Sequence, residues 1–584
     1  MYNLEQIATE KDDLRAAMKN IIKQDNTNKK KDIWIWIIPG IGVLVRLWLT
    51  ESQPLFAIGN AMHDDRLFLT LAKNILDGNW LGPFDSLTLI KGPFFSIWVA
   101  LAHILGIPLL LSGHILYAAS CLLFAHAVKP LLSNKFSFVF LYLILLFNPA
   151  GFDAALTRAT RDMIYPSLSV AVVACAFGVL LSSIYNNRTW LWATGLGVAF
   201  SCLWLTREEG MWVFPFLLFI FFAGMILIGA RNCSPAAIGM FIRPCLISLA
   251  GSMFILHAIN MLNYVNYGIY AKTEMDSYSF KAAYGALSRV KPKDVKRYVP
   301  VTKWTRRQIY QLSPAFGELA DYLEGPIGQM WVEQGNGAGR IQTNWTEILG
   351  GWFIWAFRDA VADSGYYDHG KYPDEYYRRL ADEINRACEL GRLDCLPERA
   401  TLSPVWYWYY GKYLMPSMME RILALVNFEG IIVKPIRSIG SNEQLVFFQE
   451  LTNEKILGPN LNSNSVPTAA KDHWNALRVS LLKYLLKLYQ LTMPIMAVYS
   501  AIAFMIALLH WVKKRENAVR IVIPISLLIL ILTRITLLSL INVTSWQFHT
   551  LAYLHPTHPL FLMFVFLATS ESVRSFQAIL HNRT

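Results

Sequence analysis

The sequence predicts a polytopic α-helical membrane protein with an α-rich polar domain inserted between its membrane helices. Of its 584 residues, 54% are apolar and only 16% are charged, a balance that does not fit a water-soluble chain of this length. This composition excludes a disordered chain, a coiled coil and a small disulfide scaffold. Eleven apolar segments are candidates for membrane helices, and they start near residues 33, 93, 112, 136, 164, 190, 211, 236, 491, 519 and 551.

Basic residues beside the apolar segments predict the orientation of the chain. The net charge is +12, and membrane proteins keep an excess of Lys and Arg in the cytoplasm. We therefore place residues 1–32, which carry three consecutive lysines at 29–31, in the cytoplasm together with Arg231 and residues 513–515. Residues 264–488 then lie outside the inner (plasma) membrane, and both termini are cytoplasmic. The surplus charge is an orientation signal and does not indicate nucleic-acid binding.

Two cytoplasmic termini require an even number of crossings, whereas eleven segments were found. Crossings counted forward from Lys31 and backward from Arg231 disagree between residues 93 and 149. We expect either a re-entrant segment there or a concealed crossing, which gives about 10–12 transmembrane helices. The expected domains are a cytoplasmic segment 1–32, an N-terminal transmembrane module 33–263, an extracytoplasmic soluble domain 264–488 and a C-terminal transmembrane module 489–584.

The polar interval 264–488 is predicted to be a domain, because it is far longer than an ordinary loop. Residues 374–384 place apolar side chains at helical spacing and charges on the opposite face, which predicts a helix. Cys388 and Cys395 are close together on the side expected to be oxidising, and this predicts a local disulfide. Two reduced, buried thiols are the alternative. A zinc site fits less well, since no His or further Cys accompanies the pair.

Charged residues at the outer ends of apolar helices are the candidates for chemistry, because charge at membrane depth is costly. His63, Asp64 and Asp65 precede the amphipathic segment 67–76, which we expect to lie in the membrane interface. One acid of such a pair can act as a general base for an acceptor hydroxyl or amine, while its neighbour orients it or helps to hold a cation. For two acids alone, a solvated loop edge is an equally good explanation.

The order of features around this pair resembles the GT-C superfamily of integral-membrane glycosyltransferases, which use polyprenyl-phosphate or polyprenyl-diphosphate sugars. The resemblance covers roughly residues 33–210 and implies an inverting enzyme with a GT-C-like fold. It implies that Asp64 is the acceptor-activating base, that Asp65 supports it and that Asp162 is a further catalytic acid on the second outer loop. The matching positions, in chain order, are Asp64, Asp65, Phe68, Ala72, Gly78 and Pro93.

Two further clusters supply cations that suit a phosphate. Arg158 and Arg161 lie one turn apart, and guanidinium groups bind phosphate oxygens in pairs. An interfacial anchor or a salt bridge within the cluster is the alternative for this pair, and a self-neutralised hairpin cap is the alternative for Arg207 and its acidic neighbours. Arg534 lies deep in an apolar run, where a lipid phosphate and an acid on a neighbouring helix are equally good partners. The residues expected to bind substrate or phosphate are His63, Lys91, Arg158, Arg161, Arg207, Glu208 and Arg534.

Arg46 and a group of three histidines near the C-terminus are explained by structural roles. Arg46, near the outer end of the first helix, can snorkel to the interface and needs no special role. His549, His555 and His558 could ligate a metal, but no carboxylate adjoins them, so helix capping at the interface is favoured. No metal ligand is assigned. No cofactor is certain, and a divalent cation is left open.

We therefore expect a glycosyltransferase that moves a sugar from a polyprenyl-linked donor in the lipid bilayer to a glycan, lipid or protein acceptor on the outer face. A transporter or flippase for lipid-linked saccharides is the alternative from another class. It predicts charges spread through the mid-membrane, whereas the charges here gather at one face. A non-catalytic envelope scaffold is the third interpretation.

Overall fold

The computed structural model describes residues 33–185, 188–231, 235–338, 345–458, 469–514, 518–547 and 551–581. The expected cytoplasmic segment 1–32 and His549 lie outside the described residues. Within the described ranges, the regular structure is helical, and extended pairing is limited to isolated bridges. The prediction of a polytopic α-helical protein is confirmed.

Apolar helices occupy all eleven predicted segments. In the described residues, seven of these helices are long and apolar enough to cross a membrane. They belong to α5 (Leu109–Ala127), α7 (Tyr165–Tyr185), α8 (Thr189–Thr206), α9 (Phe214–Arg231), α10 (Pro235–Tyr267), α20 (Ala469–Lys514) and α21 (Val519–Thr544). The other four apolar helices are α2 (Trp34–Thr50), α4 (Phe94–Ile104), α6 (Lys135–Leu146) and α22 (Thr557–His581).

Helix α4 lies in the interval where the two counts of crossings disagree. Its 11 residues span about 16 Å, roughly half of the hydrocarbon core of a bilayer. It packs against α3 (Asp65–Leu76) and α19 (Asn442–Thr452), and the next helix, α5, starts beside the end of α19, where the Leu110 amide donates to the Glu454 carboxylate at 2.8 Å. The short length of α4 favours the re-entrant alternative, and the number of crossings remains a prediction.

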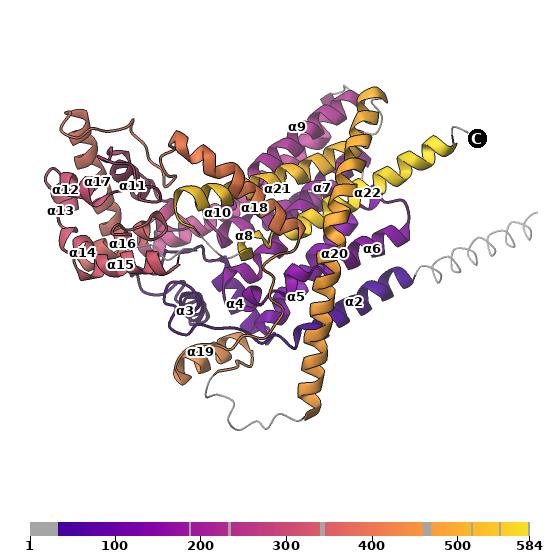
Figure 1. Ribbon diagram of the computed structural model, residues 1–584, viewed down its shortest axis with the longest axis horizontal. Helices are drawn as coiled ribbons and strands as arrows, with labels where there is room; N and C mark the ends of the chain where they lie inside the picture. Colours follow the sequence, from indigo (N-terminus) through magenta and orange to yellow (C-terminus); the bar gives the residue numbers. More distant parts are fainter. Residues whose placement is uncertain are drawn as a thin grey trace, which may run out of the picture.

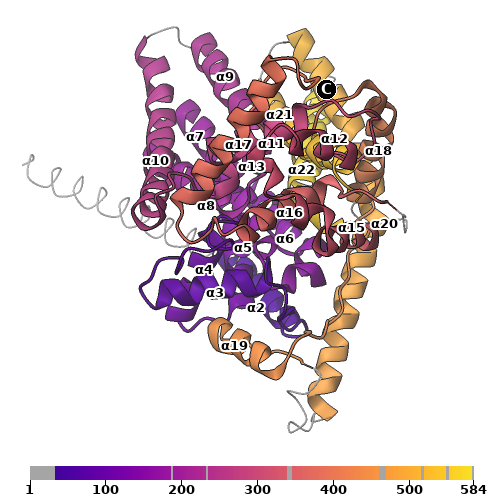
Figure 2. The same ribbon diagram turned by 90° about the vertical axis from the view of Figure 1, so that its left-hand side faces the viewer.

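A polar unit of seven helices packs at one end of the membrane helices. Figure 1 shows this unit on the left, and the start of α2 and the end of α22 on the right; Figure 2 shows the unit facing the viewer. We call it the α11–α17 unit. Its helices are α11 (Tyr278–Arg289), α12 (Lys303–Tyr310), α13 (Pro314–Gly317), α14 (Ala320–Glu324), α15 (Pro326–Ala338), α16 (Gly350–Asp363) and α17 (Lys371–Glu389).

Helix α17 shows why the sequence folds as it does in this unit. It contains the predicted helical segment 374–384, and its apolar face, including Tyr377, Leu380 and Ile384, is buried against α11. Its charged residues lie on the opposite face, as the periodicity indicates. Cys388 and Cys395 form a disulfide directly after it. The helix prediction is therefore confirmed.

Buried side chains form two hydrophobic cores that meet at α3. The first core joins the apolar helices with α18 (Gly411–Val426) and α19, and the second fills the α11–α17 unit. Helix α3 contributes Phe68, Leu69 and Ala72 to the first core, and Leu67 and Leu71 to the second. The residue that precedes α3 is Asp64, so this helix fixes Asp64 at the junction of the two cores. The boundaries of the expected domains remain predictions.

The expectation that Arg46 snorkels is wrong. The residue is 1% exposed, and its guanidinium donates to the carbonyl oxygens of Leu146 and Gly151. It also lies 4.6 Å from the ring centroid of Tyr117 and 4.4 Å from that of Phe152. The chain from α6 to residue 152 covers the end of α2 and blocks the route to water, so Arg46 is instead a buried link between helices.

Candidate functional site

A cavity of about 480 Å³ lies where the α11–α17 unit meets the membrane helices. This volume is in the range of about 300–1,000 Å³ that small-molecule sites occupy. Three charged clusters that are far apart in the sequence converge on it, because the intervening apolar helices return the chain to the same face. Seven of the predicted site residues line the cavity: His63, Asp64, Lys91, Arg158, Arg161, Asp162 and Arg207.

Asp64 presents a carboxylate to this cavity. Its Oδ1 accepts a hydrogen bond from Lys91 Nζ at 2.6 Å, and its Oδ2 lies 3.7 Å from Arg158 Nη2. Burial acts to raise the pKa of Asp64, but attraction to Lys91, Arg158 and Arg161 outweighs burial, and the pKa is lowered. The side chain remains 43% exposed. The carboxylate is therefore ionised at neutral pH and reachable from the cavity.

Asp65 lies behind the cavity wall and does not line it. Its buried carboxylate accepts from Arg158 Nη2 at 2.6 Å and Arg158 Nε at 2.8 Å, and also from the Ile58 amide at 3.1 Å. Burial raises the pKa of Asp65, and Arg158 opposes that shift. A bridge between Phe56 and Arg158 holds the two loops together at this point. Asp65 therefore fixes the direction of the Arg158 guanidinium, while its expected support of Asp64 remains a prediction.

The second and third clusters pair with each other across their loops. Arg161 Nη1 donates to Glu208 at 2.7 Å, and Arg207 contacts both Asp162 and, at 2.8 Å, Glu209. Burial acts to raise the pKa of each glutamate, but the nearby guanidinium groups lower it to about 2 in both. The Asp162 partner is thus Arg207 rather than an arginine of its own loop. Glu208 holds Arg161 and does not line the cavity.

Arg534 is buried one layer behind the cavity. Its Nη2 donates to Glu209 Oε1 at 3.2 Å and to the Tyr553 carbonyl at 3.1 Å. Pairing with an acid from a neighbouring element, one of the two partners weighed for this residue, is therefore present. Arg534 reaches the cavity indirectly, through Glu209 and Arg207.

An aromatic wall completes the cavity, and sequence reasoning missed it. Trp331 comes from α15, and Trp352 and Trp355 come from α16, so all three belong to the α11–α17 unit. Trp546 and Tyr553, from the chain between α21 and α22, add two further rings. The sequence carries no local signal that brings these residues to the charged clusters. The one available hint was the spacing of the two tryptophans in α16, which places them on neighbouring turns.

His63 links the charged residues to this wall. Its ring centroid lies 6.0 Å from that of Trp355, and Lys91 Nζ lies 5.5 Å from the Trp355 ring. Burial lowers the pKa of His63, against the attraction of Asp359, and burial raises the pKa of Asp359. His63 is therefore neutral at pH 7, when it can donate or accept a hydrogen bond.

The acidic side chains of the cavity are paired with cationic side chains, and the requirement for a divalent cation remains open. In the described part of the chain, no group of three or more His, Cys, Asp or Glu side chains is arranged to hold a metal ion. Asp64 and Asp162 are each engaged by a cationic side chain. His555, which lies in the predicted histidine cluster, has Nε2 2.7 Å from Asp153 Oδ2, an acid far away in the sequence.

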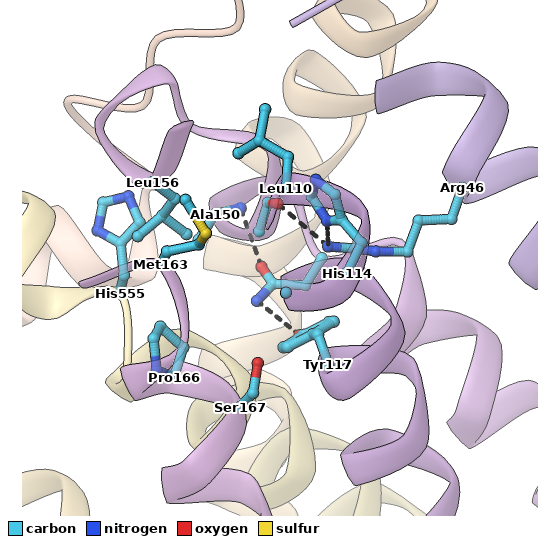
Figure 3. A pocket seen from close by; sticks show the side chains of 13 residues that line it. Arg46, Leu110, His114, Tyr117, Ala150, Leu156, Met163, Pro166, Ser167 and His555 are labelled. Atoms are coloured by element: carbon cyan, nitrogen blue, oxygen red, sulfur yellow. Dashed lines mark hydrogen bonds between the residues drawn. The ribbon is translucent and has the colours of Figure 1, made fainter. Parts of the chain in front are cut away.

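A second, smaller cavity of about 30 Å³ lies beside Arg46. Figure 3 shows the Arg46 side chain reaching His114, with Tyr117 below and His555 on the opposite side. Arg46 Nη2 lies 3.1 Å from His114 Nδ1, and Asn148 donates to the Tyr117 hydroxyl at 3.2 Å. This volume is far below that of a ligand site. The polar groups here hold the helices together.

No protein-family model matches the chain, and no curated protein matches it. Among solved structures, the chain is similar to ArnT from Cupriavidus metallidurans in the apo state, at 13% identity and a TM-score of 0.30, over 94% of this chain and 79% of that chain. It is also similar to ArnT from Cupriavidus metallidurans bound to undecaprenyl phosphate, at 12% identity and a TM-score of 0.28, over 91% of this chain and 78% of that chain. At these TM-scores neither similarity carries an argument about activity.

Proposed function

We propose that the protein is a membrane glycosyltransferase that moves a sugar from a polyprenyl-phosphate or polyprenyl-diphosphate donor to an acceptor on the outer face. One observation supports the proposal most directly. The ionised Asp64 carboxylate shares a single cavity with Lys91, Arg158, Arg161 and Arg207, at one end of a bundle of apolar helices. A base and a group of cations are the two functions that such a transfer requires.

In the proposed reaction, Asp64 accepts the proton of the acceptor hydroxyl as that oxygen attacks the anomeric carbon. The bond between the anomeric carbon and the phosphate oxygen breaks, and the polyprenyl phosphate leaves with the electron pair. The lowered pKa of Asp64 keeps the carboxylate ready to accept a proton at neutral pH. Attack from the face opposite the leaving group inverts the anomeric centre.

The cations stabilise the charge that develops on the leaving phosphate. Arg158, Arg161 and Arg207 all line the cavity, and their guanidinium groups match phosphate oxygens in geometry and charge. Asp65 and Glu208 hold two of these groups from behind, so the cations are oriented before the donor arrives. Such preorganisation favours the transition state over the ground state.

The place of the cavity supports a lipid-linked donor. It lies at the ends of apolar helices, and α3, whose N-terminus carries Asp64, packs one face into the first hydrophobic core, which these helices form. A polyprenyl chain held in the bilayer therefore brings its phosphate to the level of the cations without leaving the lipid. The resemblance of residues 33–210 to the GT-C superfamily supports the same donor class.

Substitution of Asp64→Asn tests the proposal. In proteoliposomes with a radiolabelled polyprenyl-phosphate sugar and a crude membrane-lipid acceptor fraction, we expect transfer to fall by about 100-fold or more. Asp77→Asn is the matched control, because Asp77 follows α3, is exposed and pairs with Lys73 outside the cavity. Unchanged transfer by Asp64→Asn contradicts the role of Asp64. Movement of the lipid-linked sugar between leaflets without transfer indicates a flippase, and no binding of polyprenyl phosphate indicates a scaffold.

A further inference from the structure

The aromatic wall comes from one face of the α11–α17 unit. Gly351, Trp352 and Trp355 line the cavity from α16, at positions that share one side of a helix, and Trp331 and Gln334 line it from α15. The membrane helices and their loops contribute mainly charged side chains to the same cavity. The two parts of the protein thus supply different chemistry to one site.

The wall lies next to the proposed base. Lys91 Nζ is 2.6 Å from Asp64 Oδ1 and 5.5 Å from the centroid of the Trp355 ring. The carboxylate and the indole therefore lie near the same ammonium group, on neighbouring parts of the cavity wall. A molecule stacked on Trp355 presents a substituent on its edge to Asp64.

This combination matches the two surfaces of a sugar. A pyranose ring has apolar C–H faces, which pack on flat aromatic rings, and hydroxyls around its edge, which need hydrogen-bond partners. Trp352 and Trp355 provide rings that are partly exposed in the cavity, and Gln334, His63 and Asp64 provide the polar partners. A lipid tail would instead cover these polar groups without offering them hydrogen bonds, at a cost in free energy.

We propose that the α15–α16 face is the acceptor subsite and that the acceptor is a saccharide, stacked on Trp355 and Trp352 with one hydroxyl directed at Asp64. This inference rests on the proposed transferase activity and names the chemical class of its acceptor. The cationic side chains then bind the phosphate of the donor, and the two tryptophans bind the acceptor. Because α3 joins the two cores, it sets the spacing between the two subsites.

Binding to the purified full-length protein in detergent tests the inference. The probes are the methyl glycosides of glucose, galactose, mannose and N-acetylglucosamine, their disaccharides, and undecaprenyl phosphate. We expect at least one saccharide to bind, and Trp355→Ala to weaken that binding by about 5- to 10-fold. Trp355→Phe retains a ring and should stay within about threefold of the wild type. Trp408→Ala is the matched control, because Trp408 is 92% exposed and outside the cavity.

The sugar ring on the tryptophans could come from the acceptor or from the donor. Measuring saccharide binding in the presence of the lipid probe distinguishes these two sources. An acceptor saccharide binds equally well with and without saturating undecaprenyl phosphate, and it is not displaced by a polyprenyl-phosphate sugar. Displacement by the lipid-linked sugar places the donor sugar on the wall and overturns the acceptor assignment. Absence of saccharide binding, or binding that Trp355→Ala and Trp352→Ala leave unchanged, also overturns it.

Failure of the inference is distinguishable from failure of the proposed function. If the wild-type protein binds undecaprenyl phosphate but no saccharide, the proposed donor site is supported and the proposed acceptor subsite is contradicted. Wild-type protein that binds a saccharide through Trp355, but no undecaprenyl phosphate, contradicts the lipid-linked donor. Thermal unfolding of each variant checks the fold, since Trp352 and Trp355 also pack against the second core.

Discussion

Lys91 and Asp64 are 27 positions apart in the sequence, and the Lys91 ammonium donates to the Asp64 carboxylate at 2.6 Å. Both side chains line the same cavity, so the pair forms across the first charged loop rather than along a helix. Burial lowers the pKa of Lys91, and nearby Arg161 lowers it further, while Asp64 opposes the shift. The ion pair therefore helps to keep the proposed base ionised, together with Arg158 and Arg161.

Replacing Lys91→Gln should move the acid limb of the pH–rate profile to higher pH. The lowered pKa of Asp64 keeps wild-type transfer constant as pH falls through the ordinary range of an aspartate. Without Lys91, the burial that raises this pKa is less well opposed, so the carboxylate is protonated at a higher pH. Transfer rates measured from pH 4 to 8 check the shift. Lys73→Gln, at an exposed pair, should leave the limb in place.

Asp65→Asn should weaken the binding of undecaprenyl phosphate and lower stability by about 1–3 kcal/mol. The substitution removes the buried charge that orients Arg158, which is partly exposed and can turn to water. Thermal unfolding and lipid binding measured on the same preparation check both effects. Asp394→Asn removes a carboxylate that is 76% exposed, and we expect no more than about 0.5 kcal/mol there. Full lipid affinity in Asp65→Asn would contradict the positioning role.

Arg534→Leu should lower stability by about 3 kcal/mol, because it leaves the partly buried Glu209 with only one of its two cationic partners. The double variant Arg534→Leu and Glu209→Gln should recover part of that loss. Thermal unfolding of the two single variants and the double variant measures the coupling. Strictly additive losses would show that the two side chains do not act together.

Removal of the disulfide by Cys388→Ser and Cys395→Ser should lower stability by about 2 kcal/mol, the chain-entropy estimate for so short a loop. Transfer should persist at low temperature, because the bond lies outside the cavity. Unfolding measured with and without reductant checks the effect. The double variant should not respond to reductant, and a wild type that is equally insensitive would contradict the stabilising role.

A cysteine at Gly106, in the turn after α4, should react with a membrane-impermeant maleimide from the same side as a cysteine at Lys291 in the α11–α17 unit. A re-entrant α4 places both positions on one face, whereas a crossing α4 places them on opposite faces. Labelling of sealed vesicles of known orientation separates these outcomes. Tyr185→Cys, at the far end of α7, is the control for the opposite face.

Local properties of the sequence predicted the apolar helices and the convergence of the charged clusters. Hydrophobic length and the cost of charge at membrane depth act residue by residue. The partners within the site could not be predicted, because the pairs Arg161 with Glu208 and Arg207 with Asp162 depend on how α7 and α8 pack. The Arg46 error has the same origin, since burial came from residues 146–152.

Helix α3 is shared by the two hydrophobic cores, with alternate faces buried in each. Any tilt of the α11–α17 unit relative to the membrane helices therefore pulls on the residue at the start of that helix, which is Asp64. The proposed base therefore moves together with the α15–α16 face that lies opposite it, and its position does not follow the lipid. Helix α3 therefore keeps the reacting groups at a fixed separation while the bilayer around the protein thins, thickens or bends.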